Sequence, residues 1–293
     1  MSTKSIGGAL LPCEDRFLEI EGFTLRYWEA GTSERGEDTI LLLHGLGGSV
    51  EQWAYNISDL AKDHRVIAFD WPGNGLSSLS SPDWSLPFIA GVIGRAVVSL
   101  GIHRVTLVGL SMGGALSMAL ALARPDLVDR LVLVAAAALD RHLALSLRLG
   151  TLPFAHAITG KPPRWLFSMQ ARTCVDHPDS LPTGIVDFYY GLVAREQARK
   201  AFFDILRANC DLSGMSPEML CAITNRIPEI TAPTLIIHGR NDRLIQPLNA
   251  EKGSKKFTFG HLVWFDSCRH NPQFEHADAF NNLVREHMKM DAR

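Results

Sequence analysis

The stretch LVGLSMGGAL, residues 107–116, places a serine between two glycines directly after an apolar run. Such a run is typical of a strand buried on both faces, and the residues after it favour a helix. Gly-x-Ser-x-Gly therefore falls on a predicted turn from a strand into a helix. Because Gly109 and Gly113 carry no side chain, the turn can be sharp enough to lift the Ser111 hydroxyl above the carboxyl end of the strand.

The same pattern has a simpler interpretation, in which Ser111 only caps a helix in a glycine-rich turn. The position also suits chemistry, because the free N–H of Met112 and the helix dipole favour developing negative charge. A neutral serine is a weak nucleophile and needs a base within hydrogen-bonding distance. Other residues of the chain must therefore decide between the two interpretations.

Strands and helices alternate along most of the chain. Residues 16–30 favour a hairpin around Glu21-Gly22, and six apolar runs predict buried strands: 38–45, 64–70, 103–110, 129–139, 232–239 and 260–267. Helices are expected at 51–62, 85–100, 112–123 and 273–288. This alternation is typical of an α/β fold with a mostly parallel sheet.

The alternation stops between the fourth and fifth of these runs. Five prolines in the first part of this interval precede a helix-like stretch over residues 184–211. Roughly ninety residues without regular structure would be unusual in a compact domain. We therefore predict a core of residues 1–139 and 230–293, interrupted by a helical insertion of residues 140–229. The leucines of residues 141–150 alternate as in a strand, but the residue types favour a helix.

Two polar residues follow predicted strands near the end of the chain. His270 comes just after residues 260–267, and Asp242 just after residues 232–239. Carboxyl ends of parallel strands meet at one edge of a sheet, so both are expected beside Ser111. A base at His270 can take the serine proton, and a carboxylate at Asp242 can hold the imidazole in the required tautomer. Taken singly, a surface histidine and a turn aspartate are alternatives, but the combination and its order favour a catalytic triad.

The sequence HGLGG, residues 44–48, follows the first buried run and supplies a candidate oxyanion hole. Its glycines let the backbone approach a ligand, and the N–H of Leu46 can act together with that of Met112. His44 and Gly45 are assigned to the supporting loop. A buried or loop-bracing imidazole is expected at His44 rather than a second base.

Two other aspartates require an interpretation. Asp140 follows the fourth apolar run and is the rival of Asp242 for the acid of the triad. Gly239 and Asn241 supply turn chemistry beside Asp242 and favour it. Asp70, in AFDWPGNG, is expected to brace a loop.

Composition argues against several classes of function. The chain has 293 residues, is 46% hydrophobic and carries a formal net charge of −2. A nucleic-acid or anionic-membrane partner is therefore not expected. The five cysteines are scattered, without metal-ligand spacing, and their odd number argues against a disulfide framework. The apolar stretch within residues 1–16 is too short for a signal peptide, and no run reaches the roughly 18 residues of a membrane span. We expect a cytoplasmic protein without metal or organic cofactor, and the sequence leaves its oligomeric state open.

The motifs HGLGG, RVIAFDWPGNGLSS, GLSMGG, HGRND and RHNP-x-x-E-H resemble the α/β-hydrolase superfamily, over about residues 20–290. The resemblance implies an α/β-hydrolase fold with an eight-stranded sheet and a helical cap inserted after the sixth strand. It also implies these roles: nucleophile Ser111, acid Asp242, base His270 and oxyanion donors Leu46 and Met112. The family usually has glycine before the catalytic histidine, whereas this chain has Arg269, which places a cation near the site.

A serine nucleophile in this family implies acyl transfer, because the dehalogenases and epoxide hydrolases of this fold use aspartate instead. The main hypothesis is that the protein hydrolyses a carboxylic ester of a small or medium apolar substrate through an acyl-enzyme. The insertion is rich in Leu, Phe, Tyr and Met, which favours apolar acyl or alcohol groups. Packing among the helices of the insertion explains the same composition, so the substrate stays open.

An alternative hypothesis is hydrolysis of a carbon–carbon bond in ring-fission (meta-cleavage) products of aromatic degradation. The stretches FEHADAFNNLV and HGRNDR are similar to that group. Two departures count against it: Leu46-Gly47-Gly48 stands where a further Pro-Gly is usual, and Asn271 where tryptophan is usual. Arg172 and Arg269 are candidate cations for the acid group of such a substrate. A third hypothesis is a ligand-binding receptor on the same scaffold, with little turnover.

Overall fold

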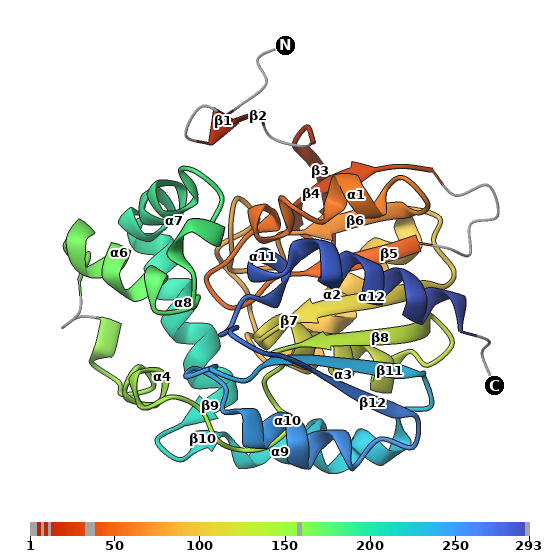
Figure 1. Ribbon diagram of the computed structural model, residues 1–293. Helices are drawn as coiled ribbons and strands as arrows, with labels where there is room; N and C mark the ends of the chain where they lie inside the picture. Colours follow the sequence, from red (N-terminus) through yellow and green to blue (C-terminus); the bar gives the residue numbers. More distant parts are fainter. Residues whose placement is uncertain (1–4, 7–8, 11–12, 33–38, 157–159, 291–293) are drawn as a thin grey trace.

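The computed structural model describes residues 5–6, 9–10, 13–32, 39–156 and 160–290 (Figure 1). The N-terminal stretch interpreted above as too weak for a signal peptide lies largely outside these residues. Every helix within them is too short or too polar to cross a lipid bilayer. The five cysteines are free thiols.

An eight-stranded sheet forms the centre of the molecule, in the order β12-β11-β8-β7-β5-β6-β4-β3. The hairpin strands β3 and β4 are antiparallel, β4 is antiparallel to β6, and the remaining neighbours are parallel. The predicted α/β-hydrolase fold and its eight-stranded sheet are confirmed. The strands are β3 (Arg16–Ile20), β4 (Phe23–Ala30), β5 (Thr39–Leu43), β6 (Arg65–Phe69), β7 (Val105–Leu110), β8 (Val128–Val134), β11 (Thr234–Gly239) and β12 (Gly260–Phe265). Two-residue strands also pair as β1 (Ser5–Ile6) with β2 (Ala9–Leu10) and β9 (Cys210–Asp211) with β10 (Gly214–Met215).

Each face of the sheet packs into its own hydrophobic core. On β5, Leu41 and Leu43 belong to one core, and Ile40 and Leu42 belong to the other. The first core includes side chains of α2 (Leu86–Ser99) and α3 (Met112–Ala123), and the second those of α1 (Ile57–Leu60) and α12 (Ala277–Lys289). A strand buried on both faces needs apolar residues at successive positions, which explains the continuous apolar runs.

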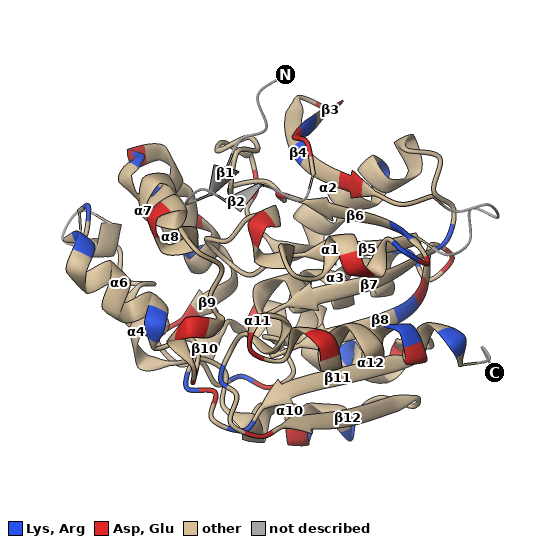
Figure 2. Cartoon of the chain, turned by 45° about the horizontal axis from the view of Figure 1, so that its top comes forward, with Lys and Arg blue, Asp and Glu red and all other residues tan. Residues whose placement is uncertain are grey.

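The segment between β8 and β11 is mainly helical, and it includes a helix rather than a strand within residues 141–150. Figure 1 shows α4, α6, α7 and α8 gathered at one end of the strands. Figure 2 shows positive and negative residues interspersed, with the strands β7 and β11 uncharged. The elements of this segment, besides β9 and β10, are α4 (Leu145–Leu149), α6 (Arg164–Arg172), η2 (Pro178–Ser180), α7 (Ile185–Ala194), α8 (Glu196–Asn209), α9 (Pro217–Ala222) and η3 (Thr224–Glu229).

Four predicted elements need correction. The helix-like stretch over residues 184–211 is divided between α7 and α8. The strand expected over residues 129–139 ends at Val134, because the chain turns where Ala135 and Ala138 adopt φ of 42° and 62°. The helix expected over residues 51–62 is two short helices, and the final helix is also divided in two. The first parts of these two divided helices are η1 (Val50–Trp53) and α11 (Pro272–Glu275). The structure also has a helix that was not expected, α10 (Pro247–Ser254).

Candidate active site

Ser111 occupies the turn from β7 into α3 in a strained conformation, with φ of 55° and ψ of −118°. Neighbouring backbone fixes this geometry on both sides of the residue. The Ser111 N–H donates to the Val134 carbonyl at 2.8 Å, and the Ser111 carbonyl accepts from the N–H groups of Gly114 (3.0 Å) and Ala137 (2.9 Å). The serine is therefore held at the carboxyl edge of the sheet by β8 and the start of α3.

Close backbone contacts require the glycines of the motif. A Cβ atom on Gly109 would lie 2.4 Å from the carbonyl oxygen of Gly113, and one on Gly113 would lie 2.2 Å from that of Leu43. Gly45 also lies against the serine, because a Cβ there would be 3.2 Å from the Ser111 Cβ. The turn and the loop after β5 are thus packed directly together.

Asp242 and His270 meet at the same edge, from the loops after β11 and β12. The Asp242 Oδ2 atom is 2.8 Å from His270 Nδ1, and Oδ1 accepts from the N–H groups of Leu244 (2.8 Å) and Ile245 (3.2 Å). Burial acts to raise the pKa of Asp242, but the imidazole beside it and these hydrogen bonds hold the pKa below its usual value. An ionised carboxylate therefore faces the imidazole.

His238 lies behind Asp242 and was not singled out from the sequence. Its Nε2 atom is 3.4 Å from Asp242 Oδ2 and 2.9 Å from the carbonyl oxygen of Ile245. Burial lowers the pKa of His238, so the ring stays neutral and can donate Nε2–H to that carbonyl. The rival acid Asp140 pairs instead with Lys252, at 3.1 Å, so Asp242 is the aspartate that contacts His270.

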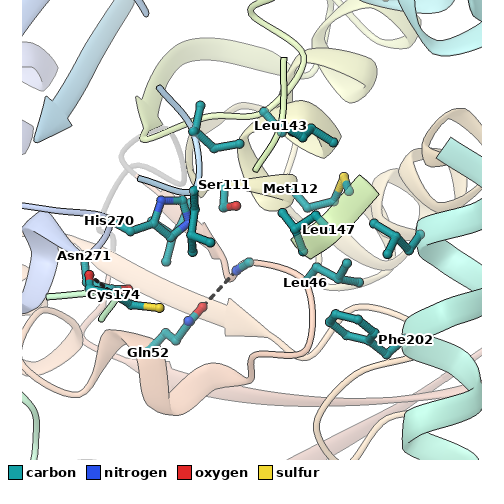
Figure 3. A pocket seen from close by; sticks show the side chains of 16 residues that line it. Leu46, Gln52, Ser111, Met112, Leu143, Leu147, Cys174, Phe202, His270 and Asn271 are labelled. Carbon is teal, nitrogen blue, oxygen red and sulfur yellow. Dashed lines mark hydrogen bonds between the residues drawn. The ribbon is translucent and has the colours of Figure 1, made fainter. Parts of the chain in front are cut away.

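A single pocket is lined by both Ser111 and His270 (Figure 3). No hydrogen bond joins their side chains, both of which are described; such contacts often form only when substrate binds. Among the described residues, the lining contains no Lys, Arg, Asp or Glu, and its polar side chains besides this pair are Gln52 and Asn271. The helical segment between β8 and β11 contributes an apolar wall of five residues: Leu143, Leu147, Cys174, Phe202 and Leu206.

The loop after β5 presents one amide without a partner. The Gly45 N–H donates to Gln52 Oε1 and the Gly47 N–H to Asn74 Oδ1, each at 2.8 Å. The N–H of Leu46, between them, has no hydrogen-bond partner in the part of the chain that the structure describes, nor does that of Met112 at the start of α3. Both residues line the pocket, so these donors are available to a ligand.

His44 and Asp70 brace this loop from beneath. His44 is fully buried, and its ring stacks on Trp71. Its Nδ1 atom lies 2.7 Å from the carbonyl oxygen of Gly45. The carboxylate of Asp70 accepts from the N–H groups of Val50 (2.7 Å) and Leu76 (2.8 Å). It also lies in a buried ionic cluster, defined by Arg26, Glu51 and Asp70. The side chain of His44 is not among those that line the pocket.

The buried imidazole of His44 predicts a specific pH dependence of stability. Burial lowers its pKa from 6.5 to about 4. Below pH 6.5 the unfolded chain takes up this proton while the folded protein does not. The contribution of His44 to stability is thus fully present above that pH and is lost as the pH falls to about 4, by about 3 kcal/mol.

Urea unfolding of the wild type and His44→Asn, at about pH 7 and about pH 4.5, measures this effect. The wild type is expected to lose more stability than the variant over this interval. The comparison is needed because Glu51 and Asp70 have raised pKa values, caused mainly by burial, and act in the opposite sense. Equal losses in the two proteins would contradict the prediction.

The two candidate cations for a substrate acid group, Arg172 and Arg269, do not line the pocket. Arg269 instead forms an ion pair with Asp176, with 3.0 Å between Nε and Oδ1. Among the described residues, no group of three or more His, Cys, Asp or Glu side chains is arranged to hold a metal ion.

A sequence profile described as "Alpha/beta hydrolase family" matches residues 40–283. The 2-hydroxy-6-oxononadienedioate/2-hydroxy-6-oxononatrienedioate hydrolase of Escherichia coli O81 is 31% identical over 278 residues, which cover 92% of this chain and 93% of that protein.

Among the solved structures that share this fold are two whose identities are too low to indicate more than the fold. The 2-hydroxy-6-oxo-6-phenylhexa-2,4-dienoate hydrolase of Rhodococcus sp. strain RHA1 has a TM-score of 0.80 and 21% identity, over 95% of this chain and 99% of that one. A serine hydrolase of the polyaromatic-hydrocarbon-degrading bacterium Cycloclasticus zankles has a TM-score of 0.79 and 23% identity, over the same shares. From the profile match and the full-length relative, the chain belongs to the alpha/beta hydrolase family and is a hydrolase.

Proposed function

We propose that the protein hydrolyses a carbon–carbon bond in a meta-cleavage product, a 2-hydroxy-6-oxo-dienoate formed by opening an aromatic ring. The similarity over nearly the whole chain to a hydrolase of such compounds carries the proposal. The pocket supports it with a serine, an Asp–His pair and two free amides. The relatives therefore favour the alternative hypothesis over ester hydrolysis.

The covalent step is attack of the Ser111 hydroxyl on the ketone carbon (carbon 6) of the substrate. His270 accepts the hydroxyl proton at Nε2, and Asp242 stabilises the resulting imidazolium through Nδ1–H. The ketone oxygen becomes an oxyanion that accepts hydrogen bonds from the N–H groups of Leu46 and Met112. Each such donor contributes about 3–4 kcal/mol to transition-state stabilisation.

The leaving group is a carbon and needs a way to delocalise its electron pair. Before Ser111 attacks, transfer of the 2-hydroxyl proton to carbon 5 gives a 2,6-diketone with a double bond between carbons 3 and 4. Breaking the bond between carbons 5 and 6 then leaves a dienolate conjugated to the C2 oxygen, which takes the proton from His270. Water next attacks the acyl group on Ser111, with His270 as base, and releases a carboxylic acid.

Ester hydrolysis is retained as a second candidate because of the pocket lining. A substrate carboxylate inside the pocket would meet no described Lys or Arg side chain, and the polar side chains of the lining besides Ser111 and His270 are the amides of Gln52 and Asn271. The apolar wall suits the acyl chain of an uncharged ester equally well.

A substrate panel tests the two candidates and the receptor hypothesis. It contains p-nitrophenyl esters of graded acyl length and a 2-hydroxy-6-oxo-dienoate, whose consumption is followed by loss of its dienol absorbance. We expect kcat/KM to be highest for the ring-fission acid. Turnover of esters alone would replace the proposal with the second candidate. Tight binding without turnover, unchanged in Ser111→Ala, would indicate a receptor.

A further inference from the structure

One carboxylate bridges the two loops that carry Asp242 and His270. Asp176 lies after α6, in the segment between β8 and β11. Its Oδ2 atom accepts a hydrogen bond from the Asn241 side-chain amide, and its Oδ1 atom is 3.0 Å from Arg269 Nε. Asn241 and Arg269 are the residues immediately before Asp242 and His270 in the sequence.

The backbone beside Asp176 makes further contacts with the loop of His270. The carbonyl oxygen of Cys174 accepts from the His270 N–H at 3.0 Å and from Asn271 Nδ2 at 3.1 Å. The carbonyl oxygen of Thr173 accepts from Arg269 Nη1 at 3.2 Å. Residues 173–176 therefore bind the loop on both sides of the imidazole.

Glu275 closes this network from α11. One of its carboxylate oxygens accepts from the Asp176 N–H at 2.5 Å, and the other from the Arg269 N–H at 2.9 Å. The Arg269 and Asp176 side chains are only 22% and 18% exposed. Because solvent screens a partly buried pair less than an exposed one, the attraction between these two side chains is stronger than that of a surface ion pair.

We propose that Asp176, together with Arg269, is a positioning residue that fixes the distance and orientation between Asp242 and His270. The proposal rests on the proposed roles of that pair. It also explains the arginine before the histidine: its side chain points to the bridging carboxylate rather than to a substrate. Because residues 173–176 also bring Cys174 to the pocket wall, that part of the wall and the alignment of the imidazole depend on the same contacts.

The test compares Asp176→Asn and Arg269→Gln with a matched control, Asp187→Asn. The control removes a carboxylate from the same helical segment and breaks an Arg–Asp pair, with Arg164, that involves neither loop. Substrate-free measurements come first: the far-downfield proton NMR signal of His270 Nδ1–H bound to Asp242, and the rate at which a fluorophosphonate labels Ser111. Then kcat and KM are measured with an activated p-nitrophenyl ester.

We expect both test variants to shift or broaden the NMR signal and to label more slowly. Their kcat should fall roughly 10- to 100-fold while KM stays within about twofold, because misplacement affects the reacting groups more than the apolar wall. Asp187→Asn should match the wild type. If Asp176→Asn does not fold, Asn241→Ala removes one partner of the same carboxylate and is read in the same way.

Wild-type signal and labelling rate in both test variants would overturn the proposal, as would an equal loss in Asp187→Asn. These outcomes are distinguishable from failure of the proposed function. An enzyme that ignores ring-fission acids still has an Asp242–His270 signal and a Ser111 labelling rate, and only these report the bridge.

Discussion

Replacement of Ser111 by alanine is expected to lower kcat/KM by roughly 10⁴- to 10⁶-fold for whichever carbonyl substrate the protein uses. The substitution removes the atom that forms the acyl-enzyme and leaves the amides of Leu46 and Met112 in place, so substrate binding should persist. Turnover in single and multiple cycles, together with the substrate Kd, measures both effects.

Ser254→Ala is a suitable control for this substitution. Ser254 ends α10, and its hydroxyl donates to the Glu251 carbonyl of its own helix. Its kcat/KM should stay within about twofold of the wild type. Circular dichroism must show that Ser111→Ala is folded, because alanine has to adopt φ near 55° there. A folded Ser111→Ala protein with substantial turnover would exclude the acyl-enzyme mechanism.

The main elements of the fold could be predicted because the apolar runs are continuous. Buried parallel strands and their short turns leave a local signature, and Met112–Ala123 is helical as expected. The ends of helices and strands could not be predicted where tertiary contacts determine them. Residues 184–211 look like one helical stretch, but the helix breaks at Arg195, whose side chain donates to the distant Gly75 carbonyl. Nothing in the local sequence specifies that contact.

Those residues of the site that come directly after a predicted strand could be predicted from the sequence. Asp242 and His270 are found in this way, because the sheet brings strand ends together. Asp176 could not be predicted in this way. It lies in an irregular segment far from Asp242 and His270 in sequence, and its role arises only from three-dimensional contacts. His238 is an intermediate case: it lies within the HGRND motif, but an apolar strand does not show which face its ring occupies.

Asp242→Asn is expected to lower kcat/KM by about 10⁴-fold. The N–H groups of Leu244 and Ile245 donate to Oδ1 and would retain the amide oxygen of asparagine there. The amide NH₂ would then face His270 Nδ1 and make it an acceptor, which places the ring proton on Nε2. In that tautomer Nε2 cannot accept the proton of Ser111.

A wrong tautomer of His270 and a simple loss of charge at position 242 lead to different orders of effect among variants. Asp242→Ala also lacks the carboxylate but imposes no tautomer, so Asp242→Asn should be at least as inactive as Asp242→Ala. Asp140→Asn should stay within about twofold of the wild type, since Asp140 pairs with Lys252 and not with His270. Measurements of kcat/KM for the three variants decide the matter. A large loss in Asp140→Asn with activity retained in Asp242→Asn would transfer the role of the acid to Asp140.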